Sequence, residues 1–209
     1  MPLMRHQQLA PAIQLGIWSI KERESFFLQR LKLRADEKRE LSAKKGLRRL
    51  EWLAGRLLLR KLLGPKARIV KDSNGKPYEV NGGWHISLSH SKGIVAAIVA
   101  DRTVGIDVQA IFNRIENLAF KFLNDEEWQS ISNQRLHHLH VYWGAKEALY
   151  KAIGNPAVLF KDHIRIKPFA YELAGGYCQG AITKNAFYSN YVLGYEALND
   201  HILVYGIKN

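Results

Sequence analysis

The sequence predicts an α+β fold of two similar lobes that meet near residue 100, and two observations lead to this prediction. A strand pattern, then helical patterns, then strand patterns run through the first half, and the second half repeats the order. No Gly/Ser-rich or Pro-rich linker separates the halves, so we expect the lobes, residues 1–100 and 101–209, to pack against each other. The 209 residues are enough to bury a sizeable core.

Hydrophobic periodicity places the individual elements. Alternating apolar residues and short apolar runs rich in β-branched residues predict strands over residues 13–20, 84–90, 94–100, 104–108 and within 164–207. Apolar residues at steps of three and four predict helices over residues 35–63, 115–131 and 136–153. Gly46 is expected to divide the first helical segment in two, and Asn74-Gly75 followed by Pro77 favours a tight turn.

The net charge of +12 arises entirely in the first half. Residues 1–100 hold 20 Lys and Arg against 8 acids, whereas residues 101–209 hold 11 of each. A one-sided basic block attracts polyanions, and nucleic acid, an anionic membrane, an acidic protein and a phosphorylated small molecule all remain open at this point. A hydrophobic content of 47% excludes the disordered and fibrous classes.

Compartment is indicated by three further features. The longest apolar runs, such as Ile94–Ala100, are far shorter than the roughly 20 residues that span a bilayer, so we expect no transmembrane segment. The first 20 residues lack the pattern of a signal peptide. Cys178 is the only cysteine, which excludes an internal disulfide and fits a reducing cytoplasm.

An acid and an acid–lysine pair are the first candidates for chemistry. Asp107 lies between apolar neighbours on an expected strand, where a charge is costly unless it binds a cation or a donor. Glu147 and Lys151 lie one helical turn apart, so with Asp107 they could form an oxygen-rich Mg²⁺ site with a cation beside it. The alternatives are an aspartate that accepts turn hydrogen bonds and an ordinary surface ion pair.

A hydroxyl-rich stretch, residues 87–93, is the next candidate. Its serines and His90 are suitable phosphate ligands, and because no Gly-x-Ser-x-Gly elbow is present we rank a Ser-His-Asp hydrolase well below phosphate binding. A polar loop with a half-exposed histidine is the alternative. Residues His137, His138 and His140 lack the His-x-x-x-His spacing of metal ligands, and we expect them on the surface.

Five motifs, taken in order, resemble those of one family. They are Gly75-Lys76-Pro77, Ile86–Ser91, Val104–Val108, Phe122–Trp128 and Trp143–Ala152. Together they are similar to the 4′-phosphopantetheinyl transferases, of the monomeric two-lobed type that activates peptide synthetases. Its signature is the pair formed by Gly-Ile-Asp and Lys-Glu motifs, in which Asp107 and Glu147 are 40 residues apart.

The resemblance implies a pseudo-twofold fold in which each lobe is a small antiparallel sheet with helices. It implies a cytoplasmic enzyme of the holo-acyl-carrier-protein synthase type, with coenzyme A in the cleft between the lobes and Mg²⁺ at its pyrophosphate. The enzyme would move the phosphopantetheine arm to a serine of an apo acyl or peptidyl carrier protein and release adenosine 3′,5′-bisphosphate. Neither nucleic acid nor membrane is an expected partner.

The resemblance also implies roles for individual residues. Asp107 and Glu147 resemble the metal ligands, and Gln109 occupies the position of a third acid, so water is expected there or Gln109 acts indirectly. Glu127, or Glu147 through water, resembles the base, and a solvated helix acid is the alternative for Glu127. Residues that match contacts to coenzyme A are Lys71, Lys76, Ser89, His90 and Lys151, with Arg48 or Arg49 at the 3′-phosphate. The exposed basic segment Lys21–Lys45 is expected to dock the carrier protein.

Two other functions remain as alternatives. A nucleic-acid-binding protein would use the basic first half, but no recognisable motif is present and the aromatic residues do not interleave with the basic ones. A transferase-like fold that binds carrier protein without catalysis is the second, and the presence of Asp107, Glu147 and Lys151 argues against it.

Overall fold

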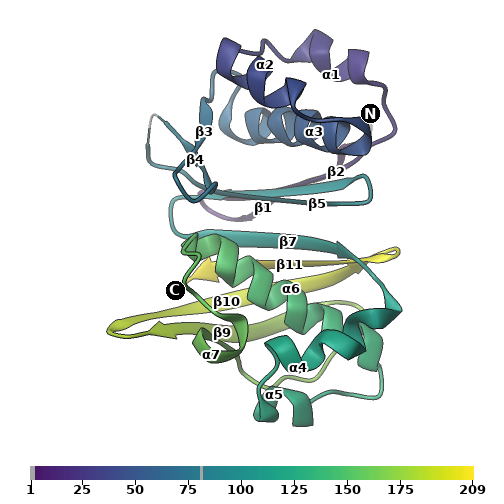
Figure 1. Cartoon of the computed structure of the whole chain (residues 1–209), viewed down its shortest axis with the longest axis vertical. Helices are drawn as coiled ribbons and strands as arrows, with labels where there is room; N and C mark the ends of the chain where they lie inside the picture. The colour runs from purple at the N-terminus through teal and green to yellow at the C-terminus, as the bar shows by residue number, and fades with distance from the viewer. Residues whose placement is uncertain (1–2, 81) are drawn as a thin grey trace.

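A computed structural model describes residues 3–80 and 82–209, and its two antiparallel sheets with covering helices confirm the α+β class (Figure 1). The first lobe has a four-stranded sheet in the order β1 (Leu3–Ala10), β2 (Ile13–Ser19), β6 (Ile94–Ala100), β5 (His85–Ser91). Its helices are α1 (Glu24–Arg30), α2 (Ala35–Ser42) and α3 (Gly46–Leu63), and a small ribbon pairs β3 (Ile69–Lys71) with β4 (Pro77–Glu79).

The second lobe begins at β7 (Val104–Ala110), an edge strand of a five-stranded sheet. The order continues with β11 (His201–Lys208), β10 (Phe187–Leu198), β9 (Gly176–Lys184) and β8 (Ile164–Ile166). Its helices are the 3₁₀ helix η1 (Asn113–Leu118), α4 (Ala119–Phe122), α5 (Asp125–Gln129), α6 (Arg135–Ile153) and α7 (Phe160–His163). No helix of the described residues is both long and apolar enough to cross a membrane.

Two differences from the expected elements have clear local causes. Residues 115–131, expected as one helix, are broken because Asn124 caps a new helix, α5, in a capping box with Glu127. Strand β1 was not expected from the sequence, and it pairs with β2 across a tight turn in which Ala12 has φ +60°. The division of the first helical segment at Gly46, with φ +54°, is confirmed.

The seam between the lobes has its own apolar core. Alternate residues of β2 and β6 face away from α3 and pack on alternate residues of β7. The buried residues of this core are Ile13, Leu15, Ile17, Ala96, Ile98, Ala100, Val104, Ile106, Val108 and Leu203. Both faces of β6 are therefore buried, which explains its continuous apolar sequence.

Alternate serines of β5 add polar contacts across the same seam. Ser87 Oγ accepts from the Ile106 backbone N–H at 3.1 Å, and Ser91 Oγ accepts from that of Ala110 at 3.0 Å. Between them, Ser89 Oγ donates to Asp107 Oδ1 at 2.9 Å. The hydroxyl-rich stretch is thus a strand and not a polar loop. Its serine hydroxyls form hydrogen bonds with backbone N–H groups and with Asp107 along the edge strand β7.

Helix α6 approaches β7 closely at Gly105. A Cβ atom at Gly105 would lie 1.8 Å from the Ala148 carbonyl oxygen, so only glycine permits this packing. The contact sets the distance between the strand that carries Asp107 and the helix that carries Glu147.

The histidines of α6 do not all lie on the surface, which corrects the expectation from the sequence. His138 and His140 are fully buried, His138 beside Tyr142 and Phe169, and His140 with Nε2 accepting from the Phe112 N–H at 3.1 Å. Burial lowers the pKa of His138 to about 4. These side chains fill the core as neutral imidazoles.

We expect Gly105→Ala to lower the free energy of unfolding by about 3 kcal/mol, because α6 must move away from β7. Gly206→Ala is the matched control: Gly206 lies opposite Gly105, and its Cβ would meet side-chain atoms of Leu149 and Leu193, the nearest being Leu149 Cδ2 at 3.1 Å. Urea unfolding of both variants provides the measurement. Equal losses in the two would contradict the close-packing argument.

A pH dependence follows from His138. Its pKa of about 4 lies below the ordinary value of 6.5, so the unfolded chain binds more protons between these values. Stability should therefore fall as pH decreases from 6.5 to about 4, with a steepest contribution of about 1.4 kcal/mol per pH unit for one proton. His138→Gln should lose this contribution in urea titrations at several pH values. An unchanged pH slope would show that His138 is not responsible.

Candidate active site

The side chain of Asp107 is the centre of the candidate site. Asp107 Oδ1 accepts from Ser89 Oγ at 2.9 Å and forms an ion pair with Lys151 Nζ at 2.5 Å. Lys151 Nζ also lies 2.9 Å from Ser89 Oγ. Asp107 Oδ2 is buried and has no hydrogen-bond partner among the described residues. The site thus has one carboxylate oxygen available to a further cation or donor.

Glu147 lies beside this cluster, on the same face of α6 as Lys151 and one turn before it. Burial raises the pKa of Glu147, the positive charge of Lys151 opposes this effect, and the negative charge of Asp107 adds to it. Two acids from β7 and α6 therefore lie close enough to repel each other.

His90 brings the first lobe to the cluster. Its Nδ1 lies 3.0 Å from Glu51 Oε2 and 2.8 Å from Arg48 Nη1. Burial lowers the pKa of His90, Glu51 opposes this effect, and Arg48 and Lys151 lower it further. Glu51 was not among the site residues predicted from the sequence. Its position one helical turn after Arg48 on α3 could have indicated it.

A cationic pocket extends from His90 along α3. It is lined by Lys44, Arg48, Trp52, Arg56, Leu59, Lys71, Gly75, Pro77, Leu88 and His90. Of the two arginines proposed for one phosphate, Arg48 lines this pocket and Arg49 does not appear in it. Arg49 binds both carboxylate oxygens of Glu24 at 2.8 Å and the Leu41 carbonyl at 2.7 Å, so it joins α1 and α2 to α3.

A second pocket adjoins the first at Gly75, Pro77 and Leu88. It is lined by Asn74, Gly75, Lys76, Pro77, Ile86, Ser87, Leu88, Tyr150, Lys151, Gly154 and Pro156. The two adjoining pockets together extend from Arg48 to Lys151, with residues of both lobes in the second, and are called the cationic path below. Lys71 reaches this path with its ammonium on Glu40 Oε1 at 2.6 Å, whereas the Lys76 ammonium donates to the Ala152 carbonyl.

The donor set fits a hard cation with few protein ligands. Among the described residues no group of three or more His, Cys, Asp or Glu side chains could hold a metal ion. The free Asp107 oxygen and the neighbouring Glu147 carboxylate provide two acids, which suffice for Mg²⁺ when water and phosphate complete the shell. Gln109 follows two residues later on β7, and its amide donates to the Ala110 carbonyl at 3.4 Å.

Glu127 is not brought to this cluster. It is buried and accepts from Lys146 Nζ at 2.7 Å, from the Asn124 N–H at 2.9 Å and from the Ile166 N–H at 2.8 Å. Lys146 is fully buried and also donates to the Ile164 carbonyl at 2.9 Å. Glu127 is thus part of an internal ion pair that joins α5, α6 and β8, and not the solvated acid considered from the sequence.

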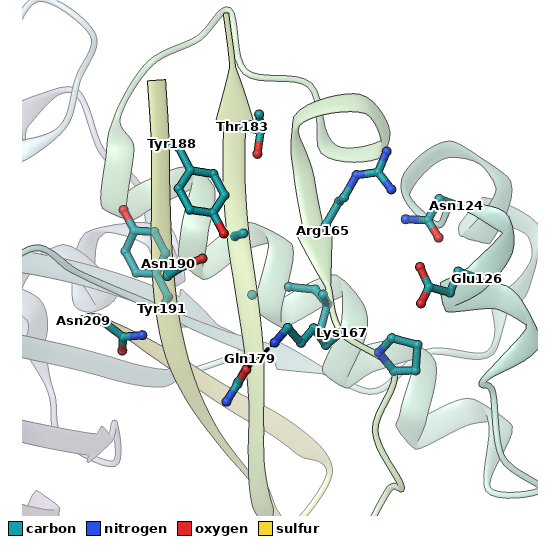
Figure 2. Close-up of a pocket in the computed structure, with 14 residues that line it drawn as sticks. Asn124, Glu126, Arg165, Lys167, Gln179, Thr183, Tyr188, Asn190, Tyr191 and Asn209 are labelled. Atoms are coloured by element: carbon teal, nitrogen blue, oxygen red, sulfur yellow. Dashed lines mark hydrogen bonds between the residues drawn. The ribbon is translucent and has the colours of Figure 1, made fainter. Parts of the chain in front are cut away.

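Another cavity, of about 330 Å³, lies over β8, β9 and β10 beside α5 (Figure 2). Figure 2 shows Arg165, Asn124 and Glu126 at one side of it, and Lys167 Nζ bound to Gln179 Oε1 at 2.8 Å. None of the site residues predicted from the sequence lines this cavity. Of the predicted residues, Ser89, His90, Asp107, Glu147 and Lys151 lie together at the lobe seam instead.

Known proteins show similarities that agree with the fold and the seam cluster. Two α+β lobes with Asp107 and Glu147 together at their junction are the arrangement that the sequence motifs imply. Residues 103–196 match the family model of the 4′-phosphopantetheinyl transferase superfamily. This match confirms the resemblance to the superfamily that the sequence motifs carry.

Curated relatives bear similar names. The chain is 32% identical over 123 residues to 4′-phosphopantetheinyl transferase AcpT of Salmonella typhimurium, covering 55% of this chain and 64% of the relative. It is 31% identical over 115 residues to 4′-phosphopantetheinyl transferase psf-1 of Bacillus pumilus, covering 49% of each. It is 31% identical over 132 residues to L-aminoadipate-semialdehyde dehydrogenase-phosphopantetheinyl transferase of Xenopus laevis, covering 49% of this chain and 42% of the relative. The chain spans less than two thirds of each of these relatives.

Because Glu127 neutralises a buried lysine, we expect Glu127→Ala to lower the free energy of unfolding by about 3–5 kcal/mol. Glu126→Ala, at an exposed neighbouring position, is the matched control and should change stability by less than about 0.5 kcal/mol. Chemical denaturation compares the two. If Glu127→Ala were as stable as Glu126→Ala, the structural role assigned to Glu127 would be wrong.

Proposed function

We propose that this protein transfers the 4′-phosphopantetheine arm of coenzyme A to a serine of an apo acyl or peptidyl carrier protein. The observation that supports this most directly is the cluster of Asp107, Glu147 and Lys151 at the end of a cationic path between the lobes. The match of residues 103–196 to the superfamily model supports the same reaction. Coenzyme A and the carrier protein are the proposed partners, and a cytoplasmic monomer of the holo-acyl-carrier-protein synthase type is the proposed form.

The proposed chemistry is an in-line phosphoryl transfer. A bond forms between the carrier serine Oγ and the β-phosphorus of coenzyme A. The bond from that phosphorus to the oxygen that bridges the two phosphates breaks, and adenosine 3′,5′-bisphosphate leaves. Such reactions depend chiefly on positioning and on neutralisation of phosphate charge, and both can be provided by fixed cations.

The residues of the path have distinct proposed roles. Lys151 is the cation nearest the acids and is oriented by Ser89 and Asp107, so it would contact the pyrophosphate. Arg48, His90 and Lys71 lie farther along the cationic pocket and would hold the 3′-phosphate end. Their positions leave the phosphopantetheine end nearest Glu147.

The serine proton requires an acceptor in the same cluster. Glu147 is the available carboxylate, since Glu127 is buried in its ion pair with Lys146. Proton transfer from the serine to Glu147 through one water is the route we propose.

Asp107 Oδ2 and the Glu147 carboxylate would hold Mg²⁺, and Gln109 would act at most through water. When bound, the ion would neutralise charge on the pyrophosphate. The pairing of Asp107 Oδ1 with Lys151 leaves Oδ2 as the oxygen free for this purpose.

The expected docking segment, Lys21–Lys45, lies mostly away from this site. Helices α1 and α2 lie on the far side of α3 from the seam (Figure 1). Several of its cations are paired within the lobe, among them Arg34 with Asp36 and Lys44 with Glu40. Only its end, at Lys44, lines the cationic pocket. We therefore do not retain the whole segment as the carrier-binding surface.

We expect the purified protein, with Mg²⁺ and coenzyme A, to add one phosphopantetheine to an apo carrier protein, seen as a mass gain on its serine. Asp107→Asn and Glu147→Gln should each lower kcat/KM by about 100-fold or more, because charge stabilisation at the phosphates is lost. Glu126→Gln, outside the seam, is the control. Circular dichroism should show that all three variants are folded.

Two outcomes would overturn the proposal. One is no mass gain with any of a panel of acyl and peptidyl carrier proteins, together with tight, salt-dependent binding to duplex DNA. The other is near-normal rates in both seam variants at limiting Mg²⁺, which would exclude the assigned acids.

A further inference from the structure

The C-terminal end of α6 has acceptors that the helix itself cannot satisfy. Gly154 ends the helix in the left-handed conformation, φ +67°, and its N–H donates to the Tyr150 carbonyl at 2.9 Å. The carbonyls of the following residues have no intrahelical donor, as at every helix end. Lys151, which contacts Asp107, belongs to this last turn. Its position therefore depends on how well the turn is held.

Donors from the other lobe satisfy this helix end. Lys76 Nζ donates to the Ala152 carbonyl, and Asn74 Nδ2 donates to the Gly154 carbonyl at 3.1 Å. The Lys76 stem packs so closely on Gly154 that a Cβ there would lie 2.5 Å from Lys76 Cδ. A positive ammonium at a helix C-terminus is also favoured by the helix dipole. Two side chains of one turn thus close on the end of α6.

The turn that carries these donors is held by hydrogen bonds to Asp72. Asp72 Oδ1 accepts from the N–H groups of Asn74 and Lys76, both at 2.9 Å, and the Asp72 N–H donates to the Lys76 carbonyl at 3.0 Å. Gly75 provides the positive φ, +84°, that the turn requires. The side chains of Asn74 and Lys76 can therefore be shortened without removing the bonds that shape the turn.

We propose that Asn74 and Lys76 form a clamp between the lobes that holds the last turn of α6 and so positions Lys151 against Asp107 and Ser89. Lys76 is then a positioning residue and not a phosphate ligand, which corrects the role expected from the sequence. Burial lowers the pKa of Lys76, consistent with an ammonium enclosed between the lobes. The effect on catalysis rests on the proposed function, whereas the effect on α6 does not.

The two roles of Lys76 predict different behaviour. A phosphate ligand would act on coenzyme A affinity, and Asn74, which has no charge, would have no similar effect. A clamp would act on the dynamics of residues 151–154 and on kcat, and the two side chains would act in the same direction. The Lys76 side chain lines both the pocket that includes Lys151 and a pocket lined by His85, Lys184 and Lys208.

Amide hydrogen exchange of the full chain, without ligands, provides the first test. In Lys76→Met and in Asn74→Ala, the amides of residues 151–154 should exchange about tenfold faster, because the last turn opens more often. Lys76→Arg keeps a donor and should restore protection close to the wild-type level. Lys66→Met, at an exposed lysine of the same lobe, is the control and should not differ from wild type.

Kinetics and binding provide the second test. Lys76→Met and Asn74→Ala should lower kcat about tenfold and leave the Kd for coenzyme A, measured by calorimetry, within about twofold. The double variant should lose less than the product of the single effects, because both donors hold one element.

The outcomes separate the clamp from the proposed function. Unchanged exchange at residues 151–154 in both variants would overturn the clamp, as would a Kd for coenzyme A raised by Lys76→Met alone. A wild-type protein without transferase activity would refute the proposed function, while the exchange data would still decide whether the clamp exists.

Discussion

The buried carboxylate of Asp107 is the point on which both lobes and α6 converge. A carboxylate taken out of water loses several kcal/mol of solvation, which must be recovered from fixed partners. Ser89 of the first lobe provides one hydrogen bond and Lys151 of α6 provides the opposite charge, both to Oδ1. The serine contacts along β5, the glycine contact at Gly105 and the seam core hold these partners at this distance.

A comparison of two buried ion pairs shows why one is a candidate site and the other is not. The Glu127 carboxylate receives a lysine and two backbone N–H groups, so both of its oxygens are used inside the fold. The Asp107 carboxylate has one oxygen without a partner among the described residues, and Glu147 stands beside it with a raised pKa. The first arrangement is complete by itself, whereas the second has capacity for a ligand. Both involve an acid and a lysine of α6, so the residue types alone do not distinguish them.

Much of the fold follows from local patterns in the sequence. The alternation at residues 13–20, the apolar run 94–100 and the glycine at 46 each predict what the structure shows, because periodicity and backbone preference are local. Strand β1 could not be predicted in this way, since its stability comes from pairing with β2. The burial of His138 likewise depends on Phe169, more than 30 residues away in the sequence. The residue types of the site could be predicted from the sequence, but the directions of its side chains could not. Arg48 and Arg49 are neighbours in the sequence, yet Arg48 lines a pocket and Arg49 binds Glu24.

The net charge of +12 is a less direct guide to ligand binding than the placement of a few cations. Several cations of the first lobe are paired with its own acids, as in the pairs of Arg60 with Glu37 and Arg56 with Glu40. Both arginines join α2 to α3, and Arg56 also lines the cationic pocket, but neither offers a full free charge to a ligand. Arg48, by contrast, is largely exposed, with 69% of its side-chain surface accessible, and it lies at the pocket mouth near Glu51. An anion entering the path would therefore meet an exposed, loosely paired arginine first and the half-buried Lys151 last. Attraction at long range and orientation at the acids are thus supplied by different residues, and only the second depends on the exact position of α6.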